Sequence, residues 1–216
     1  MKYPTIWLSI CLFCISSINA DETAMTPALA LQKLLQGNER YINDKLEHPN
    51  RSSERREAVT ATQRPFAVIV GCSDSRVSPE IIFDQGIGDL FVVRDAGNVV
   101  GPIEIASIEY SAVQLQSSII VVLGHESCGA IKAVLAGQTQ DIKPIAEQVE
   151  LAMKNYTKPS NSPLEAAIKA NVRGTAAAIK NNAHIAKLIA DKKIGVVGGY
   201  YHLGSGKVEL CCDLSD

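Results

Sequence analysis

The stretch VIVGCSDSRVSPE, residues 68–80, joins an apolar run rich in β-branched residues to a group of reactive side chains. The apolar run predicts a buried strand. A cysteine, an aspartate and an arginine then follow at alternating positions, as Cys72, Asp74 and Arg76. Such side chains directly after a strand are typical of α/β folds, whose sites form beyond the carboxyl ends of parallel strands.

Further apolar runs along the chain repeat this pattern. Strands are predicted at residues 66–71, 90–93, 118–123 and 194–198. Helical spacing of apolar residues lies between them, near residues 102–116, 129–136, 142–155, 163–181 and 183–191. The alternation predicts an α/β fold with a mostly parallel central β-sheet flanked by helices on both faces.

The two ends of this α/β region predict additional elements. Residues 27–44 read as an N-terminal helical arm that starts at Thr26-Pro27 and carries an apolar stripe suited to lying on a neighbouring subunit. A polar connector follows at residues 45–64. The stretch YYHLGSGKVELCC, residues 200–212, predicts a hairpin with its turn at residues 204–206 and an antiparallel edge strand at the C-terminal end of the sheet.

Composition limits the class of protein. The chain has 216 residues, 46% of them hydrophobic, which predicts a single domain over residues 21–216. The 21 basic residues are balanced by 23 acidic ones, so there is no electrostatic reason to expect a nucleic-acid partner.

Residues 1–20 read as a secretory signal peptide. Lys2 is the only charged residue before Asp21, residues 6–15 form a short apolar run, and the segment ends in the small residue Ala20. The run is short for a membrane span, although an uncleaved anchor is an alternative. We expect a periplasmic or secreted protein without stable membrane association after cleavage.

A second stretch, SIIVVLGHESCGAIKAVLAG at residues 118–137, also joins an apolar run to reactive side chains. A strand ends at Gly124, and His125 and Cys128 follow, three residues apart. Together with Cys72 they would form a two-cysteine, one-histidine set that suits zinc. Water or the Asp74 carboxylate would take the fourth position, and such an exchangeable position indicates a catalytic metal.

Each of these residues also has a simpler interpretation. A cysteine after a strand usually packs, Asp74 could cap a turn, and Arg76 could be a surface residue. Their convergence at adjacent strand ends favours the metal site. Cys211 and Cys212 are interpreted as packing residues, with a strained or intermolecular disulfide as the alternative.

The motifs CSDSR and GHESCG together resemble those of the β-class carbonic anhydrases. The resemblance runs from about Pro27 to Leu210 through FDQGIGDLFVVRDAGN, SIEYSA and VVGGYYHLGSGKVE. It implies one Zn²⁺ per chain, a catalytic Asp-Arg dyad and a substrate pocket at a homodimer interface, in a homodimer or dimer-based oligomer. The implied residues are Cys72, His125 and Cys128 for zinc, Asp74 and Arg76 for catalysis, and Gln63, Phe91 and Tyr110 for substrate.

Three positions bear on variation within the family. Ala96 stands where valine is common in the pocket wall. Ile69 stands where a subgroup regulated by bicarbonate has tryptophan, whereas Arg94 matches that subgroup's arginine.

The implied activity is the reversible hydration of CO₂ to bicarbonate and a proton. Hydroxide on the zinc would attack CO₂ while Asp74, held ionised by Arg76, orients it. Three alternatives stay open: a hydrolase of a CO₂ analogue such as COS or CS₂, a hydrolase with a cysteine nucleophile, and a non-catalytic zinc-binding or redox-sensing module.

Overall fold

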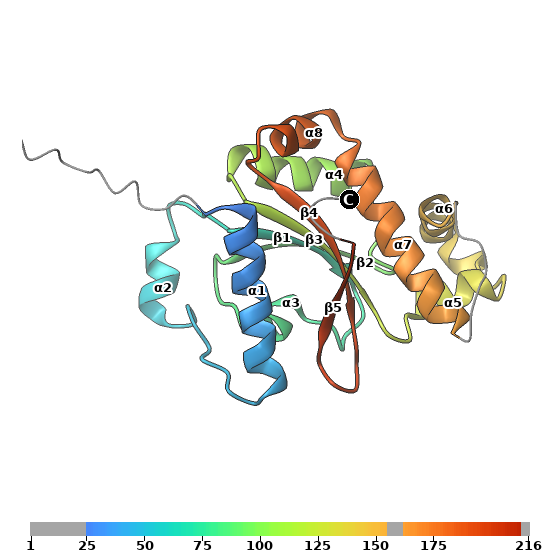
Figure 1. The fold of residues 1–216 in the computed structure, drawn as a ribbon, viewed down its shortest axis with the longest axis horizontal. Coiled ribbons are helices and arrows are strands. Elements are labelled where there is room, and N and C mark those ends of the chain that lie inside the picture. Colours follow the sequence, from blue (N-terminus) through green and yellow to red (C-terminus); the bar gives the residue numbers. More distant parts are fainter. Residues whose placement is uncertain (1–24, 155–161, 213–216) are drawn as a thin grey trace, which may run out of the picture.

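The structure, a computed structural model, describes residues 25–154 and 162–212 of the chain (Figure 1). The predicted signal peptide at residues 1–20 lies outside these ranges. Within them, none of the helices combines the length and apolar character needed to cross a membrane.

Five strands and a set of helices alternate along the described chain. The strands are β1 (Ala67–Cys72), β2 (Leu90–Asp95), β3 (Ile119–His125), β4 (Gly195–Tyr201) and β5 (Val208–Cys212). The α-helices are α1 (Pro27–Ile42), α2 (Ser53–Ala58), α3 (Pro79–Ile82), α4 (Pro102–Glu109), α5 (Gly129–Leu135), α6 (Lys143–Ala152), α7 (Pro163–Lys180) and α8 (Ala183–Ala190). A π-helical turn η1 (Tyr110–Gln114) follows α4, and a 3₁₀ turn η2 (Gln140–Ile142) precedes α6.

The strands form one sheet in the order β2-β1-β3-β4-β5. The first four are parallel, and β5 is antiparallel to β4. This confirms the predicted mostly parallel sheet with an antiparallel hairpin at its C-terminal edge. The order places β1 beside β3, so the ends of the two strands that carry Cys72 and His125 are neighbours.

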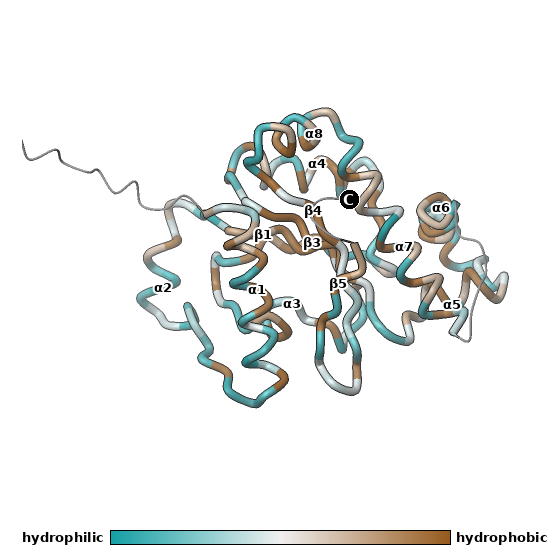
Figure 2. Tube along the Cα trace, viewed as in Figure 1, coloured by the Kyte–Doolittle hydropathy of each residue, from teal (hydrophilic) through white to brown (hydrophobic). Residues whose placement is uncertain are grey.

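Helices cover both faces of the sheet, as predicted (Figures 1 and 2). The residues of strand β1 form an unbroken apolar run because alternate side chains pack into two different cores. Ala67 and Ile69 belong to the cluster that includes residues of α1 and α3. Val68 and Val70 belong to the cluster on the opposite face, which includes residues of α4 and α8. Helix α7 contributes side chains to both clusters.

Helix α1 is the predicted N-terminal arm, and part of its apolar stripe packs against its own chain. The Thr26 side chain caps the helix by accepting a hydrogen bond from the Leu29 N–H at 3.2 Å. Ala30 and Leu34 are fully buried in the core of their own chain. Gly37 packs so tightly that a Cβ atom there would lie 1.8 Å from the Phe83 carbonyl oxygen. Ala30 and Leu34 are therefore used inside the chain, whereas Leu29, 45% exposed, leaves part of the stripe open to a neighbouring subunit.

Asn38 extends this contact between α1 and the rest of the molecule. Its buried amide nitrogen donates to the carbonyl oxygens of Ile82, at 3.1 Å, and Gly206, at 2.8 Å. Its oxygen accepts from the Val208 N–H at 2.9 Å. One side chain thus joins α1, the end of α3 and the hairpin between β4 and β5.

Local details differ from the prediction at several places. The polar connector contains α2, whose residues are mostly exposed and therefore give no helical apolar pattern. The predicted helix at residues 102–116 is α-helical only to Glu109. Strands β2, β3 and β4 extend two or three residues beyond their predicted ends, because the ladder continues through polar residues and glycine, as in the pairs Cys72–Asp95 and His125–Tyr201.

Candidate metal centre

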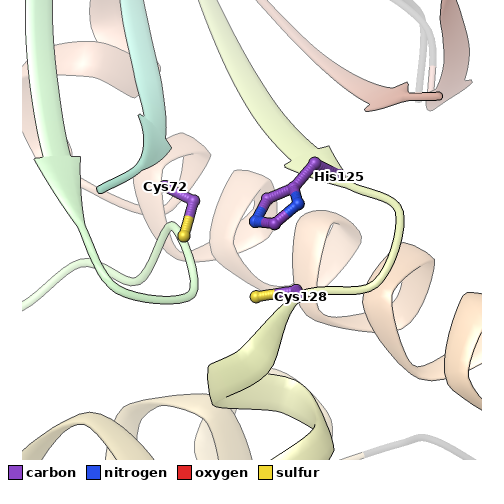
Figure 3. Close-up of side chains that lie close together, drawn as sticks. All are labelled: Cys72, His125 and Cys128. Carbon is purple, nitrogen blue, oxygen red and sulfur yellow. The ribbon is translucent and has the colours of Figure 1, made fainter. Parts of the chain in front are cut away.

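Cys72, His125 and Cys128 meet at the carboxyl ends of β1 and β3 (Figure 3). Cys72 and His125 are the last residues of their strands, and Cys128 is the residue before α5. Each offers one potential ligand atom, and the three atoms lie within 4.8 Å of one another. The side chains are buried, with 4%, 0% and 1% of Cys72, His125 and Cys128 exposed.

The orientation of His125 identifies the atom that it offers. Its Nδ1 lies 2.8 Å from the carbonyl oxygen of Glu126. A carbonyl oxygen only accepts, so Nδ1 carries the proton and Nε2 carries the lone pair. Nε2 is buried and has no hydrogen-bond partner. A buried polar atom without a partner is costly, so this nitrogen calls for a ligand from outside the chain.

The thiols of Cys72 and Cys128 influence each other strongly. The hydrogen bond with the Cys128 thiol is the largest cause that lowers the pKa of Cys72, to about 4. The same neighbour and burial raise the pKa of Cys128. The backbone N–H of Gly97 also donates to Cys72 Sγ, at 3.2 Å. Two sulfurs and one imidazole lone pair are the ligand set that zinc prefers, so the residues present fit this metal.

Asp74 and Arg76 form an ion pair at the rim of the cluster. Asp74 Oδ1 accepts from the Arg76 backbone N–H at 3.0 Å and from Nε at 2.9 Å, and Oδ2 accepts from Nη2 at 2.6 Å. Hydrogen bonding to Arg76 is the main reason why the pKa of Asp74 lies well below its usual range. Asp74 Oδ2 lies 3.9 Å from His125 Nε2. The carboxylate is therefore ionised, held by Arg76, and close to the ligand atoms without being one of the three.

Arg94 positions this segment from the neighbouring strand. From β2, its Nε donates to the Cys72 carbonyl oxygen and its Nη2 to the Asp74 carbonyl oxygen, each at 2.8 Å. The sequence matched Arg94 only to the arginine of a subgroup regulated by bicarbonate, so its role in positioning Cys72 and Asp74 was missed. The role of the Gly97 N–H was also missed, although RDAGN, residues 94–98, spans the end of β2 at the same edge of the sheet and could have suggested it.

The other three predicted site residues lie elsewhere in the chain. Phe91 and Tyr110 contact each other, with ring centroids 6.2 Å apart, and Gln63 lies in the exposed segment before β1. Phe91 is paired with Val68, four residues before Cys72. Four residues of a parallel strand span about 13 Å. The structure therefore does not bring Gln63, Phe91 and Tyr110 to the metal cluster of their own chain.

A cavity of about 860 Å³ also lies away from the cluster. Its lining includes Phe66, Ser118 and Ile194, which precede β1, β3 and β4. Because the cluster is at the opposite ends of these strands, the chemistry and the large cavity occupy different edges of the sheet.

Comparisons with known proteins match most of this chain. A family model described as carbonic anhydrase matches residues 67–208. A carbonic anhydrase of Mycolicibacterium smegmatis is 40% identical over 197 residues, covering 88% of this chain and 96% of the relative. Carbonic anhydrase 2 of Mycobacterium tuberculosis is 38% identical over 191 residues, covering 85% of this chain and 92% of the relative.

Solved structures give the same match in three dimensions. The β-carbonic anhydrase CcaA superposes with a TM-score of 0.66 at 26% identity, over 83% of this chain and 86% of that one. A Coccomyxa β-carbonic anhydrase in complex with acetazolamide gives a TM-score of 0.63 at 26% identity, over 83% and 85% of the two chains.

Proposed function

This chain belongs to the β-class carbonic anhydrases, and from that premise we propose that it hydrates CO₂ reversibly to bicarbonate and a proton at the cluster of Cys72, His125 and Cys128. The observation that carries the proposal is the buried, unpartnered Nε2 of His125, which faces two thiols beside the Asp74–Arg76 pair. Zinc held by these ligands would supply Lewis-acid chemistry, lowering the pKa of a water molecule towards neutrality.

The part that the chain itself plays follows from the lone pairs of Asp74. A carboxylate oxygen has two acceptor positions. Oδ1 uses both for Arg76, whereas Oδ2 uses one. Oδ2 is therefore the oxygen that can accept a hydrogen bond from the attacking water, and it is the oxygen near His125 Nε2. Such a bond would fix the direction of the water's remaining lone pair towards CO₂.

Arg76 has two effects in this proposal. Its hydrogen bonds keep the pKa of Asp74 low, so the carboxylate stays an acceptor at neutral pH. They also hold Asp74 away from the ligand atoms, which leaves a fourth position open for water. Arg94 supports the same geometry by fixing the backbone at Cys72 and Asp74.

We also propose a homodimer in which each subunit completes the site of its partner. Gln63, Phe91 and Tyr110 are too far from their own cluster to contact the same substrate. Tyr110 belongs to an exposed apolar stripe at helical spacing on α4 and η1, formed by Ile103, Ala106, Tyr110 and Val113. Such a stripe is typical of a contact surface, and a twofold dimer would cover it.

We propose from residues 1–20 that the protein is exported to the periplasm or secreted. The charged Lys2, the apolar run and the small residue Ala20 support export. Protein purified from the native host should begin near Asp21 and fractionate outside the cytoplasm. Soluble cytoplasmic protein that retains Met1 would contradict this proposal.

The proposed activity is tested by metal content and CO₂ hydration measured together. We expect about one zinc per chain, loss of stopped-flow CO₂ hydration after chelation, and recovery when zinc is added back. COS and CS₂ hydrolysis are assayed on the same sample. Full CO₂ hydration by metal-free protein, or turnover of the analogues without CO₂ hydration, would overturn the assignment.

A further inference from the structure

Strand β5 ends in two adjacent cysteines whose arrangement differs from that of an ordinary strand. In a regular strand, neighbouring side chains point to opposite faces of the sheet. Here Gly199 pairs with Leu210 and Gly198 pairs with Cys212. One step along β4 therefore matches two steps along β5, and Cys211 is the extra residue of a β-bulge.

The bulge places both thiols on the same face of the sheet. Cys211 and Cys212 both pack against the cluster that includes α7 and α8. A Cβ atom on Gly198 would lie 2.6 Å from Cys212 Sγ and 3.5 Å from Cys211 Sγ. Both sulfurs therefore surround one point above Gly198, and the absence of a side chain there makes room for them.

The surroundings of Cys211 favour the neutral thiol. Burial raises the pKa of Cys211 to about 12. The nearby cations of Arg173 and Lys169 act in the opposite direction on the same thiol. Both cysteines are only partly buried, so a small reagent can reach them.

We propose that Cys211 and Cys212 form a dithiol site that chelates one soft, thiophilic metal or metalloid centre. Thiolate sulfur selects soft ions, and two sulfurs on one face can bind the same centre. With a trivalent arsenical R–As=O, two As–S bonds form, the As=O bond is lost, and the two thiol protons leave with the oxygen as one water molecule. No electron is transferred, so the reaction needs no oxidant.

This site is separate from the zinc cluster. Gly198 pairs with Val122, three residues before His125 on β3, and His125 itself pairs with Tyr201. Within the described residues, the group of potential metal ligands at Cys72, His125 and Cys128 does not include either cysteine of β5. Binding at β5 should therefore leave zinc in place.

Titration of the zinc-loaded protein with phenylarsine oxide tests the proposal. We expect one equivalent to bind per chain, two thiols to disappear from a thiol titration in denaturant, and the zinc content to stay constant. Cys211→Ser and Cys212→Ser should each weaken binding on the order of 10²-fold, because one thiol cannot chelate. Circular dichroism and zinc content of both variants check that they are folded.

Two results would overturn the proposal. One is that the single variants bind phenylarsine oxide as tightly as the unchanged chain. The other is that binding releases zinc while Cys211 and Cys212 stay reactive, which would place the arsenical at Cys72 and Cys128. The double variant, Cys211→Ser with Cys212→Ser, is the matched control. Within the described residues, its remaining thiols are Cys72 and Cys128 of the zinc cluster.

Discussion

The metal cluster and the Phe91–Tyr110 region, which we propose belong to one site, are built in different ways. The cluster is buried and complete within one chain, because two adjacent parallel strands end at the same edge of the sheet. Phe91 and Tyr110 lie towards the other ends of the strands, and Tyr110 is 49% exposed. The difference shows that the three potential metal ligands meet within the single chain, whereas the proposed substrate residues would reach a metal cluster only in the proposed dimer.

Cys128→Ser should give the largest effect, because it removes a ligand from the self-contained region. We expect loss of zinc, loss of CO₂ hydration and a lower free energy of unfolding, since metal binding contributes to folding stability. Metal analysis, stopped-flow assays and urea unfolding measure the three effects. Cys211→Ser is the matched control and should keep zinc and activity. A Cys128→Ser protein with one zinc and normal activity would refute the metal site.

Asp74→Ala should separate catalysis from metal binding within that same region. Three protein ligands remain, so zinc should stay bound, but the rate should fall on the order of 10²-fold because the reacting water is no longer oriented. Arg76→Ala should also keep zinc, and its activity should fall steeply as Asp74 loses the partner that holds it. Metal content and CO₂ hydration are measured for both. Near-normal hydration by Asp74→Ala would assign the pair a purely structural role.

Ile103→Glu tests the region that depends on a partner. Ile103 is 76% exposed on the stripe with Tyr110. A carboxylate in an apolar contact should weaken the dimer tenfold or more, at a cost above about 1.4 kcal/mol. Sedimentation should show monomers that retain zinc and have little activity at low concentration. Leu151→Glu, at a 65% exposed leucine on α6, is the control and should remain a dimer. A fully active monomer would contradict the shared site.

The Glu109–His184 pair should give the smallest effect. His184 Nδ1 lies 2.8 Å from Glu109 Oε1, and this bond lowers the pKa of Glu109. A carboxyl whose pKa is lowered by folding stabilises the folded state at pH values above its unfolded pKa. This stabilisation is lost as the pH falls through the pKa of the folded state. His184→Gln should cost less than about 1 kcal/mol at neutral pH and nothing at strongly acidic pH. Urea unfolding at both pH values measures this difference. A loss of several kcal/mol would contradict it.

The sequence predicted the parts of the fold that repeat a simple pattern. Strands such as β1 and β3 are buried on both faces, so their apolar runs are unbroken and easily found. Cys72, His125 and Cys128 were found because each follows such a run. Helix α2 was missed because a six-residue helix without buried residues has no apolar face to show.

Features set by contacts between distant residues could not be read from the sequence. The bulge at Cys211 depends on how β5 pairs with β4, and adjacent cysteines alone predict opposite faces. The role of Arg94 depends on β2 lying beside β1. The division of the α1 stripe into the buried Ala30 and Leu34 and the exposed Leu29 could not be predicted either, because spacing predicts an apolar face without specifying what covers it.

The three hydrogen bonds of Asn38 have a consequence for the order in which the chain folds. Two of its partners, Gly206 and Val208, lie 168 and 170 residues further along the chain. Docking α1 before these residues are available would bury the amide with two of its three hydrogen bonds unmade, at a cost of about 1–3 kcal/mol. During synthesis the helix that emerges first should therefore lock into place last, and a growing chain should stay open until its final hairpin leaves the ribosome.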